Sequence, residues 1–579
     1  MRARKSRFAL FALVALALPL GACGTVSRMM LGGSEVVTVP PSSDAKAYGA
    51  YLSARLAANR HDIADAARFY RGALKVDPKD TDLLNRAFLY TASAGEMDEA
   101  AKLAHRVVAV SPDDRAARLA LAVEALANSD YSGAHDQIAK SAGGPFAALT
   151  LTLLDAWAAE GEGKTDAALA ELKKLPDEGG SRSIAEFHSA LMLDLAGRNA
   201  AADAAYRAAI EAAGPSPREI DAYGRFLERT GKIAEATMFY TKLSQVGSAV
   251  PITAAGLKRI AAHEKPGRLV ANPQAGAAEA LFGIAASLTD EPDADVAVFY
   301  LRLFYLRLAL QLEPHLDLAR IVLADRFEAI GNYADAVRAF DSVDPSSPYK
   351  TTAAIQAAID ETHLGQTAKA LATLKAITAA DPKNVLAWTA LGDVYRSGKR
   401  YLEAADAYDH AVKATPAIDK SDWPLFYARA VSYESAKNWP AAERDLQQAL
   451  KLSPDQPEVL NFLGYSWVDH GENLPAALAM LQKARSLSPE DGYIVDSVGW
   501  AYYRLGRYQD AAQTLQQAVT LVPGDSTIND HYGDALWRVG RRLEARFQWN
   551  HALAFGPEPN EKAQLENKLK YGLANGNGH

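Results

Sequence analysis

The sequence predicts an all-α solenoid, a fold in which one helical hairpin is repeated along the chain. An alanine recurs every 34 residues in the first half, and the same register returns in the second half with small insertions. A Gly often lies five residues before these alanines, and a Pro often lies twelve residues after them. The alanines are Ala66, Ala100, Ala134, Ala168, Ala202, Ala236, Ala336, Ala370, Ala404, Ala442, Ala477, Ala511 and Ala545.

Each residue type in this spacing has a physical role in a pair of antiparallel helices. The Gly ends the first helix and permits the turn, and the Ala lets the two helices approach closely. The Pro starts the next unit, because a helix tolerates Pro in its first turn but not in its interior. Such hairpins bury their apolar faces against neighbouring hairpins, so we expect the repeats to stack into an elongated superhelix.

One unit shows the full pattern, with Trp388, Leu391, Gly392, Tyr395, Ala404, Tyr408, Ala411 and Pro416. This unit resembles the tetratricopeptide repeat at every signature position. The resemblance covers most of the chain, from about Ala47 to Pro557. It implies a tetratricopeptide-repeat superhelical solenoid of roughly 14 helix-turn-helix repeats with an irregular joint near the middle.

The joint is predicted where the register fails. Lys265-Pro266-Gly267 and Asn272-Pro273 break helices there, and Arg302 stands in an alanine slot, a place that Ala297 could take instead. The segment is either a joint between two superhelical arms or one degenerate repeat with normal stacking. The predicted units are an N-terminal array over 47–245, an irregular helical joint over 246–300, a C-terminal array over 301–560, and a capping helix with a frayed tail over 561–579.

The N-terminus has the pattern of a secretion signal. Basic residues precede an apolar run from Phe8 to Leu20, which is too short for a stable membrane anchor. The run ends in Leu20-Gly21-Ala22-Cys23, which resembles the lipobox of bacterial lipoproteins. The resemblance implies a signal peptide over 1–22, lipidation (palmitate) of Cys23 and a flexible tether over 23–46. Gly24 then favours an outer-membrane location facing the periplasm; the alternative is an ordinary signal peptide with an incidental Cys.

Charge and motif searches exclude several other functions. Removal of residues 1–22 takes away four basic residues and no acidic one, which leaves 58 basic against 70 acidic residues, a net charge of −12. So acidic a chain is not expected to bind nucleic acid. The run from Gly161 to Thr165 ends like a nucleotide-binding loop but has Ala158 where that motif needs its first Gly. The 12 His show no metal-ligand spacing, so we expect no metal, nucleotide or other cofactor.

The remaining candidate for function is the concave groove. In tetratricopeptide repeats, positions 2, 5, 9, 12 and 13 commonly face this groove, and near the C-terminus they carry aromatic rings beside charges, which are typical of binding hot spots. The alternative is that these side chains only fill a tight superhelix. Aspartates at these positions favour a basic or neutral partner segment over an acidic tail. The residues are Asn461, Tyr465, Asp469, Tyr493, Asp496, Trp500, Tyr503, Arg504, Asp530, Asp534, Trp537 and Arg538.

The run from Asn461 to Tyr508 is similar to long tetratricopeptide lipoproteins of Gram-negative bacteria. The resemblance implies a lipid-anchored periplasmic scaffold that recruits protein partners in cell-envelope assembly or maintenance. A component of a polysaccharide export complex is the alternative, and an enzyme with an unrecognised site is the third possibility. We expect no catalysis, because almost no sequence remains for a domain that could hold a preorganised site.

Overall fold

The computed structural model describes residues 43–143, 145–176, 179–244, 250–288 and 296–573. These residues form 30 α-helices and one short 3-10 helix (Lys420–Asp422), with no strand among them, which confirms the predicted all-α class. The proposed signal peptide, Cys23 and residues 24–42 of the tether lie outside the described residues. The first helix begins at Ser43, four residues before the predicted start of the repeats.

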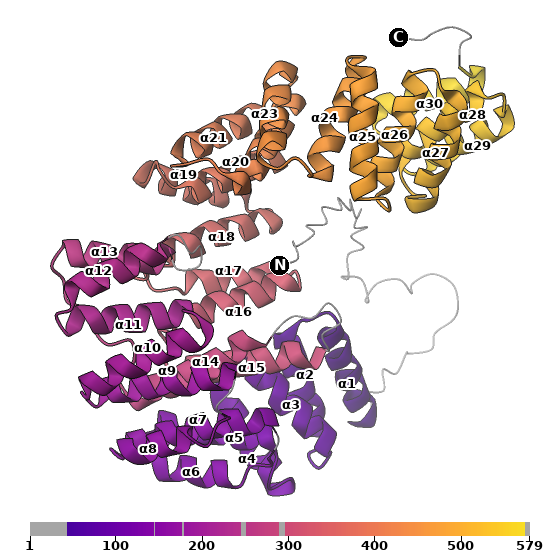
Figure 1. The fold of residues 1–579 in the computed structure, drawn as a ribbon. Helices are drawn as coiled ribbons and strands as arrows, with labels where there is room; N and C mark the ends of the chain where they lie inside the picture. Colours follow the sequence, from indigo (N-terminus) through magenta and orange to yellow (C-terminus); the bar gives the residue numbers. More distant parts are fainter. Residues whose placement is uncertain (1–42, 144, 177–178, 245–249, 289–295, 574–579) are drawn as a thin grey trace, which may run out of the picture.

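Antiparallel pairs of helices form the N-terminal array, and a further first helix, α13, follows them (Figure 1). The helices are α1 (Ser43–Asn59), α2 (Ile63–Val76), α3 (Thr81–Ala94), α4 (Met97–Val110), α5 (Arg115–Ala127), α6 (Tyr131–Ala139), α7 (Pro145–Gly161), α8 (Thr165–Leu172), α9 (Gly179–Leu195), α10 (Asn199–Ala213), α11 (Pro217–Arg229), α12 (Ile233–Leu243) and α13 (Val250–Ala261).

After a central hairpin of α14 (Pro273–Ser287) and α15 (Val296–Leu312), further antiparallel pairs form the C-terminal array. Its helices are α16 (Asp317–Ala329), α17 (Tyr333–Asp341), α18 (Lys350–His363), α19 (Thr367–Ala380), α20 (Val385–Ser397), α21 (Tyr401–Ala414), α22 (Trp423–Ser435), α23 (Trp439–Leu452), α24 (Pro457–His470), α25 (Leu474–Leu487), α26 (Gly492–Arg504), α27 (Tyr508–Leu521), α28 (Ser526–Arg538), α29 (Arg542–Ala554) and the closing helix α30 (Pro559–Tyr571).

The register alanines form the tightest contacts of the fold. All thirteen lie on the second helix of a pair, and each has 0% of its surface exposed. The glycines that lie five residues before these alanines are found at the ends of first helices, in the left-handed conformation that the turn requires. Gly95, for example, has a φ of +88°. The spacing therefore produces the fold as predicted: a small residue where helices meet, and a residue without a Cβ where the chain reverses.

The two helices of a repeat differ in their neighbours, and this difference makes the array curve. First helices of successive repeats contact one another, as α24 contacts α26 and α26 contacts α28, far more than second helices do. Because the first helices are closer together, they line the concave inner wall and the second helices form the outer surface. None of the described helices combines the length and apolarity needed to cross a bilayer.

The closing helix α30 covers the C-terminal end of the solenoid. Leu565 on its inner face is buried with 1% exposed, while most of its other described residues are exposed. Lys568 extends from α30 to Asp530 and Asp534 of α28. The segment thus packs as a polar capping helix, which shields the last repeat from water. Residues 574–579 of the predicted tail lie outside the described residues.

Candidate functional site

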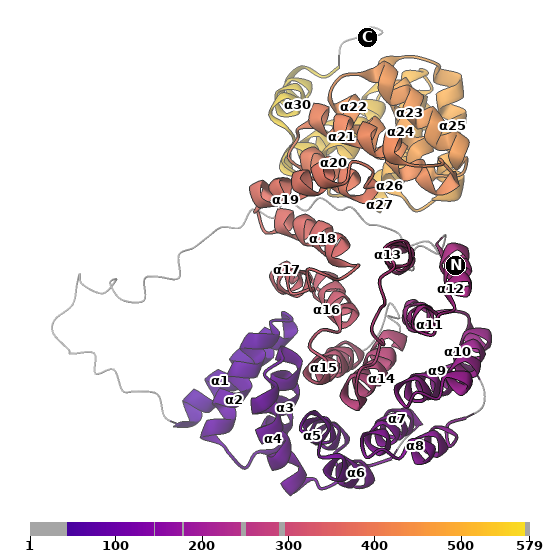
Figure 2. The ribbon, with the colours of Figure 1, turned by 90° about the vertical axis from the view of Figure 1, so that its left-hand side faces the viewer.

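The concave wall of the N-terminal array is covered by the chain's own central hairpin. Helix α14 packs on α7 and α9, and α15 packs on α3, α4 and α5, so the hairpin lies inside the arc of the first helices (Figure 2). Tyr305 of α15 shares a hydrogen bond of 3.0 Å with Thr150 of α7. Gly276 of α14 brings its backbone against the ring of Trp157, which is fully buried. The hairpin therefore covers the faces of α3, α5, α7 and α9 that it contacts.

Polar contacts from the hairpin to the array accompany these apolar ones. Arg218 of α11 donates to Glu279 of α14 at 3.0 Å, and both side chains are largely buried. Gln274 at the start of α14 donates to the Leu126 carbonyl at 3.2 Å. Arg307 of α15 donates to the Ser93 carbonyl at 3.3 Å, where the negative end of the α3 dipole stabilises its charge.

The structure shows how the break in register at residues 246–300 is built. The hairpin of α14 and α15 is not stacked in series with the repeats before it but packs against α3, α5, α7 and α9, and α15 then contacts α16 of the C-terminal array. Arg302, which takes an alanine slot in the register, is buried there with 6% exposed. The side chain of Ala297, the proposed substitute, lies outside the described ones.

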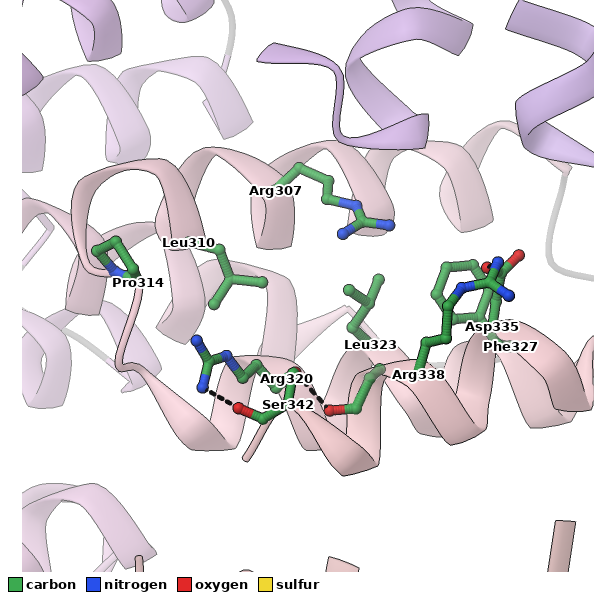
Figure 3. A pocket seen from close by; sticks show the side chains of 10 residues that line it. Arg307, Leu310, Pro314, Arg320, Leu323, Phe327, Asp335, Arg338 and Ser342 are labelled. Atoms are coloured by element: carbon green, nitrogen blue, oxygen red, sulfur yellow. Dashed lines mark hydrogen bonds and ion pairs between the residues drawn. The ribbon is translucent and has the colours of Figure 1, made fainter. Parts of the chain in front are cut away.

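A cavity of about 290 Å³ lies where α15 meets α16 and α17 (Figure 3). Arginines line it, but they already have partners in the chain. Arg320 pairs with Asp317 at 3.3 Å, Arg338 pairs with Asp335, and Arg307 donates to α3. The cavity thus belongs to the connection between the central hairpin and the C-terminal array.

The inner wall of the C-terminal array is the candidate binding surface. Register positions that face this wall carry more acidic than basic side chains between α16 and α24. They include Asp325, Glu328, Asp393, Glu434, Glu458 and Asp469, against Arg396. A cavity of about 510 Å³ opens on this wall beside Asp325 and Gln356. Acidic side chains in a concave surface concentrate negative potential there, which favours a cationic ligand.

Four predicted residues of α26 lie on this wall and remain at least partly accessible. Tyr493 is 56% exposed, and Trp500, Tyr503 and Arg504 are half-buried. The ring of Trp500 stacks on Tyr503, with centroids 4.7 Å apart, and on His531 of α28, with centroids 4.0 Å apart. This stack is a rigid aromatic surface of the type that anchors partner segments.

The predicted residues of α24 extend the same wall. Asn461 and Tyr465 are half-buried and Asp469 is exposed, with its carbonyl accepting from Arg504 at 3.3 Å. Burial and the charges of Asp496 and Asp469 raise the pKa of the Tyr465 hydroxyl above its ordinary value. This hydroxyl therefore stays protonated, so it can donate a hydrogen bond to a ligand.

Three predicted aspartates are bound inside the protein and do not face a ligand. Asp496 is 5% exposed and lies 3.0 Å from the imidazole of His531. Asp534 is 6% exposed and accepts from Trp549 at 2.9 Å and from Lys568 at 2.9 Å. Asp530 accepts from Lys568 at 2.7 Å. The aspartates have these partners because α30 and the next first helix pack against their positions.

The repeat pattern does not predict His531 and Lys568 as partners of these aspartates. Burial alone would lower the pKa of His531, but the charge of Asp496 and its hydrogen bond hold this pKa above its ordinary value. The signal that could have identified these partners is the register itself, since Asp496 and His531 lie 35 residues apart, close to one repeat length.

The other predicted residues of α28 form the capped end of the wall. Trp537 lies between Trp549, at a centroid distance of 5.4 Å, and the guanidinium of Arg542, 5.2 Å from its ring. Arg538 donates to the Tyr503 hydroxyl at 3.3 Å. The predicted residues of α24 and, apart from the buried Asp496, those of α26 thus form an accessible surface, whereas the predicted residues of α28 mainly pack against neighbouring side chains.

Three buried polar atoms on successive first helices have no hydrogen-bond partner among the described residues. They are Oε2 of Glu434 on α22, Oδ1 of Asn461 on α24 and Nε1 of Trp500 on α26. A buried polar atom without a partner costs about 1–3 kcal/mol, and a bound main chain or side chain can supply the missing bonds. A ligand that displaced the side chains covering these three atoms could form hydrogen bonds with them.

Comparison with known proteins identifies the repeat family. The family model described as tetratricopeptide repeat matches residues 356–417, 427–492 and 497–558. The part of the chain from 356 to 558 therefore carries tetratricopeptide repeats. Such repeats generally mediate protein–protein interactions by holding peptides or proteins in a groove, and they are typically non-catalytic. No curated protein matches the sequence.

Solved structures that are similar to this chain have low sequence identity to it. The APC/C hetero-tetramer Cut9-Hcn1 is 14% identical, covers 91% of this chain and 96% of its own, and has a TM-score of 0.38. Yeast Tom70 is 12% identical, covers 92% and 96%, and has a TM-score of 0.34. A tetratricopeptide repeat protein from Parabacteroides merdae is 15% identical, covers 44% and 97%, and has a TM-score of 0.36.

Proposed function

We propose that this protein is a lipid-anchored periplasmic scaffold on the outer membrane, and that the wall from α22 to α26 holds a cationic or neutral segment of a partner protein in envelope assembly or maintenance. The observation that carries the binding site is the set of unpartnered polar atoms beside the Trp500 stack. The N-terminal wall is covered by α14 and α15, which leaves the C-terminal wall as the surface for a partner.

The chemistry of this wall defines the segment that would fit. The stacked rings offer apolar area, and the carboxylate of Glu434 and the amide oxygen of Asn461 accept hydrogen bonds. An extended segment with a Lys or Arg side chain would supply donors, and its main-chain carbonyl could accept from Trp500. An acidic segment would meet repulsion from Asp469 and Glu434.

Replacing Trp500 by Ala should weaken binding of a cationic peptide about 30-fold, because loss of a central aromatic anchor costs about 2 kcal/mol. The measurement is fluorescence anisotropy with peptides of matched length that carry a positive, zero or negative net charge. Trp439→Ala is the matched control, since Trp439 stacks on His470 in the same way but lies on the second helix α23. Equal affinity for all three peptides, or an equal loss in both variants, would contradict the proposed groove.

Replacing Cys23 by Ser should abolish fatty-acid labelling and release the protein from the membrane fraction. Stable anchoring needs several acyl chains, and the thiol is their proposed point of attachment. Metabolic labelling with an alkyne fatty acid, followed by fractionation, measures both effects. The Trp500→Ala variant should keep its label, because Trp500 lies in the folded body. Labelling that persists after Cys23→Ser rejects the anchor without affecting the groove.

A further inference from the structure

The first helix of the solenoid leaves a stripe of large apolar side chains uncovered. On α1, Tyr48 is 70% exposed, Leu52 is 63% exposed and Leu56 is 51% exposed. Their spacing of four residues places them on one face of the helix. We call Tyr48, Leu52 and Leu56 the N-terminal edge.

The register shows that this edge is a stacking surface. Positions equivalent to Leu52 and Leu56 are Ala390 and Val394 on α20, with 4% and 3% exposed, and Ser497 and Ala501 on α26, with 4% and 1% exposed. In these internal repeats both positions are buried, and the helices that carry them pack against the preceding repeat. At the other end of the solenoid α30 acts as the cover. Among the described residues, α1 has no such cover, although its side chains are the larger ones.

We propose that the N-terminal edge rests on the membrane surface, with Tyr48, Leu52 and Leu56 entering the lipid headgroup region. The proposal rests on the proposed lipid attachment at Cys23. Only residues 24–42 separate Cys23 from α1, and 19 residues span at most about 65 Å in any conformation. The edge is therefore the folded surface held nearest to the bilayer.

The charge beside the N-terminal edge and the small size of the edge favour lipid over a protein partner. Arg55 and Arg60 are exposed beside the edge and suit anionic headgroups, while tyrosine and leucine suit the interface. One 17-residue helix offers much less than the roughly 800 Å² per partner that a stable dimer buries. The preceding residues are a poor source of a covering helix pair, because Gly32-Gly33 and Pro40-Pro41 interrupt helices.

The test uses the chain from residue 23 onward with Cys23→Ser, so that no acyl chain contributes. The probe is vesicles of phosphatidylethanolamine and phosphatidylglycerol, and the readout is flotation. The wild-type edge should bind them weakly, and Leu52→Asp combined with Leu56→Asp should reduce binding at least tenfold. Leu543→Asp with Phe547→Asp on α29 is the matched control, because those residues are 82% and 62% exposed at the opposite end.

Several outcomes would overturn the membrane-facing edge. Equal vesicle binding by wild type and edge variant would do so, and so would an equal loss in the α29 control. Light scattering that finds a dimer in the wild type and a monomer in the edge variant would assign the edge to a second copy. Because the protein in this assay carries no lipid, its result is separate from the labelling test of Cys23.

Discussion

Replacing Gly276 by Ala should destabilise the protein by about 1–3 kcal/mol, the usual cost of forcing an extra methyl group into a packed interior. A Cβ at this position would lie 2.3 Å from ring atoms of Trp157. That ring has little freedom to move, because Trp157 is fully buried and its Nε1 donates to His188 at 3.1 Å. The added methyl group should therefore push α14 away from the N-terminal wall.

The matched control is the same substitution at Gly283, seven residues further along α14. No atom lies within 4 Å of a Cβ built there, so Gly283→Ala should raise stability by about 0.8–1 kcal/mol through helix propensity alone. Urea unfolding followed by tryptophan fluorescence and circular dichroism measures both changes. If Gly276→Ala also raised stability, α14 would not lie against Trp157, and the N-terminal wall would be open to partners.

The repeats could be predicted from the sequence because their rules are local. Each register alanine needs only its own hairpin partner, and each turn glycine needs only its own backbone. The central hairpin follows no such rule. Tyr300 donates to the carbonyl of Ala58, 242 residues earlier, and Gln274 contacts residues about 145 positions away. A spacing pattern holds no information on contacts of this range, so the segment could be identified only as a break in the register.

The sequence predicts where the groove lies, but not which of its side chains are accessible to a ligand. The repeat register predicts that Trp500 and Asp496 face inward from one first helix, and both residues lie on α26. The two side chains differ in their hydrogen bonds. His531 binds Asp496, whereas Nε1 of Trp500 has no partner among the described residues. Whether an inward aspartate faces a ligand depends on its neighbour one repeat away. The register shows where that neighbour lies, but the repeat motif does not determine which side chain it carries.

A second large effect is expected near the start of the C-terminal array, at Asp360 on α18. Asp360 is 1% exposed, and its burial together with the charge of Glu328 raises the pKa of Asp360 to about 8; Asp325 and Glu361 add to the rise. The folded state therefore keeps a proton that the unfolded chain releases near pH 4. The resulting stabilisation is complete below pH 4 and is lost as the pH rises towards 8.

Replacing Asp360 by Asn should remove this loss, because the amide stays neutral and can still donate to Glu328. The variant should match the wild type near pH 4 and exceed its free energy of unfolding by at least ~2 kcal/mol at pH 8, since each pH unit in this window is worth about 1.4 kcal/mol. Urea unfolding at pH 4, 6 and 8 measures the trend. Asp406→Asn should leave it unchanged, because that carboxylate is 76% exposed. If the variant instead gained the same free energy of unfolding at all three pH values, the gain would come from better packing. Asp360 would then be ionised in the folded protein.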